Sequence, residues 1–191
     1  MLTYRMKRCT IERKMTTNSA VKRMTAIHEA GHTVAHLRLH EHFYIGKITI
    51  VPDENRHTEG LGEFEEPDFG SVDDWRDEVV ILCAGFAAQI IFGDVEEQAT
   101  AGASSDFEKA QEIVSAWDLG PLTDHIETAK ILLDEPRNRR AVERIANELT
   151  KVETLDSDDL QILSDIADGK ATEASYARFK LLRAGPIGSK E

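Results

Sequence analysis

The spacing of apolar residues along the chain predicts a fold built mostly from helices. From Ser19 to about His40, apolar positions recur three or four residues apart, which is the spacing of one buried helix face. Residues 1–17 show no such period, and we expect residues 1–18 to form a basic, flexible arm. The first helix is therefore predicted to begin near Ser19.

A short β element is predicted to follow this helix. Residues 45–51 alternate in polarity and contain several β-branched side chains, and Pro52 ends the run. A second extended piece consists of Leu61, Gly62, Glu63 and Phe64. The two pieces can pair as a small sheet or hairpin beside the first helix.

A long apolar helix is predicted to come next. Ser71-Val72-Asp73-Asp74 has the form of a capping box, with Asp74 in the third helical position. The helix is expected to run to Phe92 and to be closed by Gly93. Residues 79–88 are apolar on nearly every side, which predicts a central, buried helix. Its small residues favour close packing in the core over contacts between copies of the chain; they are Ala84, Gly85, Ala87 and Ala88.

The second half of the chain is predicted to be helical as well. Residues 94–103 are typical of a loop, and Ser104 or Ser105 is expected to cap a helix that ends near Trp117. Further helices are expected over residues 123–133, 137–150, 157–168 and 172–183. The predicted fold class is mainly α, with some α+β character from the one small sheet. We divide the chain into the arm, a main domain over residues 19–168, and a helical extension with a tail over residues 169–191.

The motif His28-Glu29-Ala30-Gly31-His32 carries the clearest chemistry. Residues four apart lie on one face of a helix, so the two imidazoles can converge on one metal ion. Neutral imidazoles suit zinc, and a catalytic zinc site has three protein ligands and a water whose pKa the ion lowers to about 7. Glu29 can take a proton from that metal-bound water and pass it to a leaving amine. The motif therefore predicts a zinc-dependent metallopeptidase.

Spacing alone does not decide which residue supplies the third ligand. The candidates are Glu78, Asp106, His57 and His125. His36 and His40 continue the four-residue spacing, but each step of four advances ~6 Å along the helix and drifts by ~40°. One ion cannot collect three such rings in series, so these two histidines are not expected to be ligands.

Composition and charge narrow the range of partners. The net charge is −12; residues 1–25 hold seven basic residues against one acid, whereas residues 53–78 hold eleven acids against two arginines. An acidic body of this kind repels nucleic acid, so no nucleic-acid partner is expected. No apolar run approaches the roughly 18 residues of a membrane span, and Cys9 and Cys83 form no metal-type pair. We therefore expect a cytoplasmic protein without a membrane span.

Several motifs, in order along the chain, resemble those of one protease family. Residues 83–93 resemble the motif LAGRAAEELIFG, and residues 100–110 resemble TTGASNDLEKA. Together with the zinc helix at residues 25–32, these motifs are similar to the peptidase domain of the FtsH family of membrane-anchored AAA proteases, peptidase family M41. Shorter matches extend the resemblance over residues 21–161; they lie at residues 47–52, 61–62, 117–121 and 153–156.

The resemblance implies roles for particular residues and partners. It makes the aspartate of the GASND motif, here Asp106, the third zinc ligand. It implies that extended substrate adds as a strand to the sheet edge at residues 61–64, and that copies of the domain form rings. The family joins this domain to an ATPase, but this sequence has no phosphate-binding G-x-x-x-x-G-K-[ST] loop. The domain is therefore expected either to cut unfolded proteins or peptides directly or to take substrates from a separate ATPase.

The chain departs from the family pattern in two places. Phe86 and Gln89 stand where the family has Arg and Glu, which affects polar contacts behind the site or at an interface. Residues 162–191 have no recognised counterpart. Neither departure touches the motif at residues 28–32 or Asp106.

The sequence supports one leading function and one alternative. The leading prediction is a zinc-dependent metalloendopeptidase that hydrolyses peptide bonds in unfolded proteins or peptides, with Glu29 as the general base. The alternative is a catalytically weak or inactive binding or regulatory module that retains structural zinc. Glu29 favours the enzyme, because a structural zinc site needs no general base. A zinc hydrolase acting on non-peptide amides has no specific support in the sequence.

Overall fold

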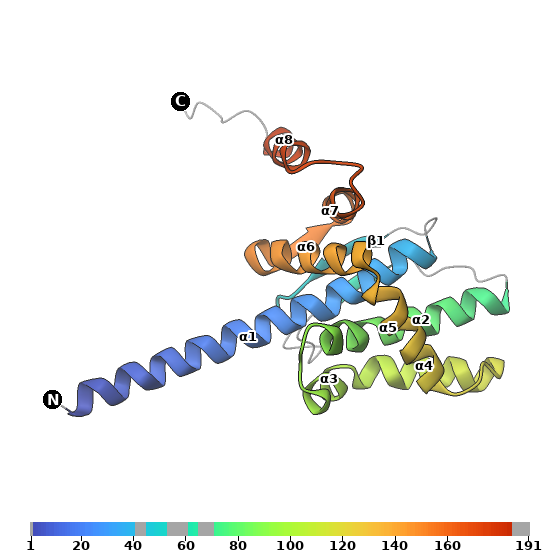
Figure 1. The fold of residues 1–191 in the computed structure, drawn as a ribbon, viewed down its shortest axis with the longest axis horizontal. Helices are drawn as coiled ribbons and strands as arrows, with labels where there is room; N and C mark the ends of the chain where they lie inside the picture. Colours follow the sequence, from blue (N-terminus) through green and yellow to red (C-terminus); the bar gives the residue numbers. More distant parts are fainter. Residues whose placement is uncertain (1, 41–44, 53–60, 65–70, 185–191) are drawn as a thin grey trace.

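A computed structural model describes residues 2–40, 45–52, 61–64 and 71–184, and of residues 2–18 and 61–64 it describes the backbone alone. The described part contains eight helices and one small sheet (Figure 1), so the prediction of a mainly α fold is confirmed. The helices are α1 (Leu2–Leu39), α2 (Val72–Ile91), α3 (Glu96–Gly102), α4 (Ser104–Trp117), α5 (Leu122–Asp134), α6 (Pro136–Val152), α7 (Ser157–Ala167) and α8 (Glu173–Arg183). The strands are β1 (Ile45–Thr49), β2 (Leu61–Phe64) and β3 (Thr154–Asp156).

Helix α1 begins well before the expected position. The prediction of an irregular segment over residues 1–17 is wrong for residues 2–17, because the helix runs unbroken from Leu2. Residues 2–30 contain no proline or glycine, and they are rich in strong helix formers such as Arg, Lys and Met. Figure 1 shows why the apolar period is missing there: the first half of α1 extends past the other elements, so it has no core to face. The division into arm, main domain and extension stays a prediction.

Two expectations around residues 94–105 are wrong. A short helix, α3, lies where a loop was predicted, and its first turn carries Glu96 and Glu97, which favour a helix N-terminus. Helix α4 begins at Ser104, so neither Ser104 nor Ser105 caps it from outside, and the preceding Ala103 makes no side-chain cap hydrogen bond. The capping box at Ser71 and Asp74 is confirmed.

The sheet has three strands rather than the two expected. Its order is β2-β1-β3, and both pairings are antiparallel. At the centre, Ile48 lies opposite Gly62 on one side and Leu155 on the other. The backbone N–H of Ile50 also donates to the carbonyl of Glu153 at 2.9 Å. The third strand therefore links the small β element to the C-terminal half of the molecule.

Helix α2 lies at the centre of the core, as predicted. Its residues from Val79 to Gln89 are buried, apart from Leu82, and it contacts α1, α4 and α5. Helix α1 approaches α2 closely at Gly31, where an added Cβ would lie 2.6 Å from the carbonyl oxygen of Ala84 and 2.6 Å from the Cβ of Ala88. The small residues of α2 therefore serve the core of the chain, because they let the metal-motif helix approach.

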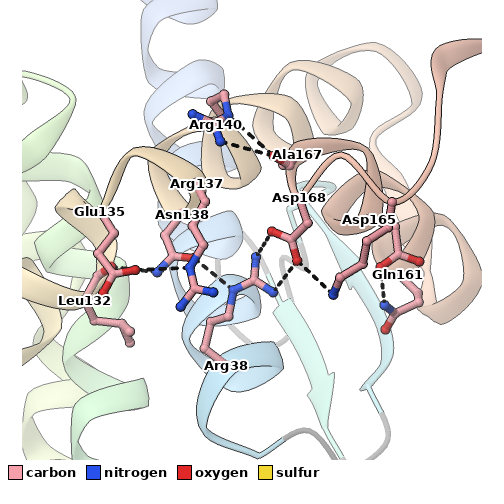
Figure 2. A network of polar contacts seen from close by, with 11 residues as sticks. Arg38, Leu132, Glu135, Arg137, Asn138, Arg140, Gln161, Asp165, Ala167 and Asp168 are labelled. Carbon is pink, nitrogen blue, oxygen red and sulfur yellow. Dashed lines mark hydrogen bonds and ion pairs between the residues drawn. The ribbon is translucent and has the colours of Figure 1, made fainter.

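The C-terminal half of α1 is also fixed by a polar network (Figure 2). The Arg38 guanidinium donates to Asn138 Oδ1 at 2.8 Å and to both carboxylate oxygens of Asp168, at 2.7 and 3.1 Å. Asn138, fully buried on α6, donates in turn to the carbonyl of Leu132 at 2.8 Å. Charge-assisted and bidentate hydrogen bonds of this kind are the stronger and more directional ones. They hold α1 in one register against α5, α6 and the end of α7.

None of the helices in the described part of the chain combines the length and the apolar character needed to cross a bilayer.

Candidate metal centre

Helices α1 and α4 bring three potential metal ligands together. His28 Nε2 lies 3.2 Å and His32 Nε2 lies 3.3 Å from Asp106 Oδ2, and the two imidazole nitrogens lie 3.0 Å apart. In a tetrahedral zinc site with bonds of about 2.0–2.2 Å, neighbouring ligand atoms lie roughly 3.3 Å apart. The triangle formed by these three atoms therefore fits three corners of a zinc tetrahedron.

The other ring nitrogen of each histidine has its own partner. His32 Nδ1 lies 2.8 Å from the carbonyl oxygen of Ile81, which can only accept, so this nitrogen carries a proton. His28 Nδ1 lies 2.9 Å from Gln89 Oε1. Hydrogen bonds at Nδ1 fix the ring orientation and direct Nε2 toward a metal, as in characterised histidine–zinc sites.

Gly85 of α2 provides the space for both rings. A Cβ at this position would lie 2.5 Å from His32 Nε2 and 2.6 Å from His28 Cε1. The site is therefore lined on this side by backbone rather than by a side chain.

Glu29 lies beside the three ligands and is 7% exposed. Burial raises its pKa above the usual value, and the nearby His32 and His28 act against that rise. A raised pKa makes the carboxylate a better proton acceptor, provided that water can reach it. The role of Glu29 as general base stays a prediction.

His32 and Asp106 also form a charge pair. Burial raises the pKa of Asp106, but the neighbouring His28 and His32 outweigh that effect and lower the pKa well below the usual range. Burial lowers the pKa of His32, but hydrogen bonding to Asp106 outweighs it and raises that pKa to about 9. In the absence of metal a proton on His32 thus balances the Asp106 charge. A bound cation would take the place of that proton.

The other ligand candidates do not join this group. Among the residues that the structure describes, His28, His32 and Asp106 form the one cluster of three ligand atoms within 4.8 Å of one another. Glu78 Oε2 lies 3.9 Å from the Nε2 atom of His40, which directly follows the last residue of α1. His125 Nε2 contacts the carbonyl of Leu119 at 3.1 Å. His57 lies outside the described residues.

Two residues near the site were not expected from spacing. Gln89 contacts His28, and the one signal for it was its departure from the family motif. Phe86, the other departure, is 5% exposed and packs edge-on against Phe107 of α4, with ring centroids 5.2 Å apart. Phe107 follows Asp106 directly, so Phe86 supports the turn that carries the third ligand.

The sheet edge also agrees with its expected place. Strand β2, which comprises Leu61, Gly62, Glu63 and Phe64, is a terminal strand of the sheet, and α1 contacts both β1 and β2. A terminal strand leaves one row of backbone groups for another chain to pair with. Binding of substrate there stays a prediction.

The mainly α fold and the geometry of these residues are those expected of a helical zinc metallopeptidase domain. The family model for "Peptidase family M41" matches residues 15–117. The chain belongs to this family.

Curated relatives agree with this assignment. The ATP-dependent zinc metalloprotease FtsH of Neorickettsia risticii is 30% identical, over 78% of this chain and 28% of its own length. The protein of the same name from Streptococcus pneumoniae serotype 4 is 28% identical, over 92% of this chain and 32% of its own length. The protein of the same name from Lachnoclostridium phytofermentans is 39% identical, over 47% of this chain and 15% of its own length. The chain thus spans about a third or less of the length of these relatives.

Proposed function

We propose that this chain is a zinc-dependent metalloendopeptidase that hydrolyses peptide bonds in unfolded proteins or peptides. The observation that carries the proposal is the near-equilateral triangle of His28 Nε2, His32 Nε2 and Asp106 Oδ2, with sides of 3.0, 3.2 and 3.3 Å. Glu29 lies buried next to it. Two imidazoles and one carboxylate are a ligand set for catalytic zinc, which keeps its fourth position open.

The residues divide the chemistry between them. Zinc, when bound, supplies a Lewis acid and lowers the pKa of a coordinated water. His28 and His32 hold the metal as neutral imidazoles, and the Asp106 carboxylate neutralises part of its charge. Glu29 accepts the proton of the attacking water and delivers it to the leaving amine. Its burial keeps it close to the reacting atoms and strengthens it as a base.

Substrate and partners follow from the fold and from the relatives. We propose that an extended polypeptide pairs with the outer edge of β2 and so passes the metal site. The relatives are named as ATP-dependent proteases, and residues 1–191 contain no phosphate-binding loop of the G-x-x-x-x-G-K-[ST] type. We therefore infer that any ATP-driven unfolding is supplied from outside these residues, and we place the protein in the cytoplasm.

Metal analysis tests the ligand assignment. The wild-type chain, purified with zinc and freed of loosely bound metal, is expected to hold one zinc per chain. Asp106→Ala and His28→Ala should each hold far less. Glu108→Ala is the matched control, because Glu108 is an exposed acid on the same helix and should leave the zinc content unchanged. Full zinc occupancy in Asp106→Ala would show that the third ligand is wrong.

Peptide cleavage tests the catalytic assignment. Glu29→Gln should keep its zinc and lose at least 10²-fold in cleavage of unfolded casein or of a peptide library, because a positioned general base contributes about 10²–10⁴-fold. A wild-type chain that holds zinc but cleaves none of these substrates would favour the binding or regulatory module. Comparable cleavage by wild type and Glu29→Gln would remove Glu29 from the mechanism.

A further inference from the structure

A chain of hydrogen bonds extends from His28 away from the metal site. Gln89 of α2 is 7% exposed, and its Oε1 lies 2.9 Å from His28 Nδ1. Its Nε2 lies 3.0 Å from Asp94 Oδ2, in the turn between α2 and α3. Asp94 Oδ1 accepts the backbone N–H of Val95 at 2.8 Å. The backbone N–H of Asp94 donates to the Gln89 carbonyl at 3.0 Å, which closes the turn.

These contacts fix which way each group points. An ionised carboxylate can only accept hydrogen bonds, so the Gln89 atom that faces Asp94 must be the amide NH₂. The amide oxygen then faces His28 and requires a proton on Nδ1. A neutral imidazole with that proton has its lone pair on Nε2. This atom lies 3.2 Å from Asp106 Oδ2 and 3.0 Å from His32 Nε2, and a proton on His32 Nε2 can be donated to the lone pair.

We propose that Gln89 is a positioning residue, oriented by Asp94, that selects the Nδ1–H tautomer of His28 and so prepares Nε2 to bind the metal. The proposal rests on the zinc site described above, but its central claim concerns the protein without metal. The Asp94 carboxylate accepts from the Gln89 amide and from the Val95 backbone, and it acts on His28 through the Gln89 amide.

The Gln89 side chain needs its contact with Asp94 because an amide, unlike a carboxylate, has two different ends. A carboxylate next to His28 would accept from Nδ1 in either orientation, whereas an amide offers an acceptor from one end and donors from the other. If the Gln89 amide were reversed, its NH₂ would face Nδ1 and favour a proton on Nε2. That tautomer cannot bind zinc without losing the proton. The choice between the two orientations therefore depends on Asp94.

The variant Asp94→Asn gives the sharpest test. Its side-chain oxygen can keep the Val95 contact, which turns the new NH₂ toward the NH₂ of Gln89. Two donors then face each other, and the Gln89 amide is expected to reverse. Two-dimensional ¹H–¹⁵N NMR of the zinc-free protein should show His28 changing from the Nδ1–H to the Nε2–H form. Zinc affinity, measured by competition with a chelator of known affinity, should fall about 10–100-fold.

A reciprocal exchange provides the rescue. In the double variant Gln89→Glu, Asp94→Asn, the new amide donates to the new carboxylate, and that carboxylate accepts from His28 Nδ1. Zinc affinity and the Nδ1–H tautomer should return. Gln89→Glu alone places two carboxylates about 3 Å apart, where like charges repel, and is expected to perform worse than the double variant. Glu97→Gln, an exposed acid on the neighbouring α3, is the matched control and should match wild type.

The outcomes separate this proposal from the proposed function. An unchanged His28 tautomer and zinc affinity in Asp94→Asn would overturn the positioning role. Failure of the double variant to recover either property would also overturn it. The double variant restores matching donors and acceptors between residues 89 and 94, and a contact that only fills space would not depend on that match. A wild-type protein that binds no zinc would contradict the proposed function, whereas the tautomer measurement in zinc-free protein would still decide the role of Gln89 and Asp94.

Discussion

Gly85 faces His32 so closely that a Cβ on the glycine would lie 2.5 Å from the imidazole Nε2. The same Cβ would lie 2.6 Å from Cε1 of His28. Real Cβ atoms do not approach other atoms so closely, so any side chain here must displace both rings. The metal site thus depends on a residue that offers no chemistry of its own.

Gly85→Ala is expected to abolish stoichiometric zinc binding and to lower the free energy of unfolding by about 1–3 kcal/mol, the usual cost of overpacking a buried site. Zinc content and urea denaturation measure the two effects. Gly102→Ala on α3 is the matched control, because its added Cβ would lie 3.8 Å from Gln89 Oε1, an ordinary contact. Normal zinc content in Gly85→Ala would contradict the described packing of α1 on α2.

Phe86→Ala is expected to weaken zinc binding without touching a ligand. The ring packs against Phe107, the residue after Asp106, so its removal leaves a cavity behind the first turn of α4. The expected loss of stability is about 3–5 kcal/mol, together with weaker zinc binding by chelator competition. Phe86→Leu fills most of the cavity and should retain most of both properties. Equal zinc affinity in wild type and Phe86→Ala would show that α4 is held without this contact.

Asp168→Asn tests the network that fixes α1. Arg38 and Asp168 are largely buried, and Arg38 donates to both oxygens of the carboxylate. An asparagine has one acceptor oxygen, so the variant keeps one of these two hydrogen bonds, without the negative charge, and turns an NH₂ toward the guanidinium. We expect the free energy of unfolding to fall by about 1.5–3 kcal/mol, in the range for hydrogen bonds to charged groups. Arg137→Ala is the control, because Arg137 pairs with Glu135 at the surface and should change stability by less than ~1 kcal/mol. Similar losses in both variants would contradict a special role for Arg38.

The ion pair between Glu148 of α6 and Lys180 of α8 is expected to make the stability of the protein depend on pH. Burial raises its pKa, but hydrogen bonds from Lys180 of α8 and from Lys151 outweigh it and lower the pKa below the usual value. A carboxyl with a lowered pKa in the folded state adds stability above its unfolded pKa, about 4.3, and that stability is lost as the pH falls through the folded value. Wild type should therefore exceed Glu148→Gln in stability at pH 7, and the difference should shrink below about pH 4. A difference independent of pH between 3 and 7 would contradict the ion pairs. Glu143→Gln, an exposed acid on the same helix, is the control.

The sequence predicted those parts of the fold whose signal is local and repeated. The period of α1 after Ser19, the alternation at residues 45–51 and the capping box at Ser71 each contain several residues that agree with one another. Strand β3 has three residues, too few to show alternation. It forms because Leu155 pairs with Ile48, which lies far away in the sequence. Helix α3 is similarly short, with seven residues.

The candidate site likewise contains residues that the local sequence predicts and residues that it does not. His28, Glu29 and His32 lie within five residues, so helix geometry alone relates them. Asp106 could not be chosen over Glu78 or His125 from spacing, because the choice depends on how α4 crosses α1 and α2. Resemblance to the family supplied it, and the 3.2 and 3.3 Å distances agree. The departure from the family motif singled out Gln89, but the contacts of Gln89 and Asp94 depend on the direction of individual hydrogen bonds, which neither spacing nor resemblance supplies.

The order of the strands has a consequence for how the chain reaches its native state. Strand β1 leaves the ribosome early, yet one of its two neighbours is β3, and the side chains of Thr49 and Thr154 that meet at 2.9 Å are 105 residues apart. The loop that this contact closes is long, and distant strand pairings form slowly. Until residue 156 has been synthesised, β1 presents an open edge, which is a common starting point for aggregation. A piece ending at residue 117, where the family match stops, would keep that edge open permanently and is expected to need chaperones or to precipitate.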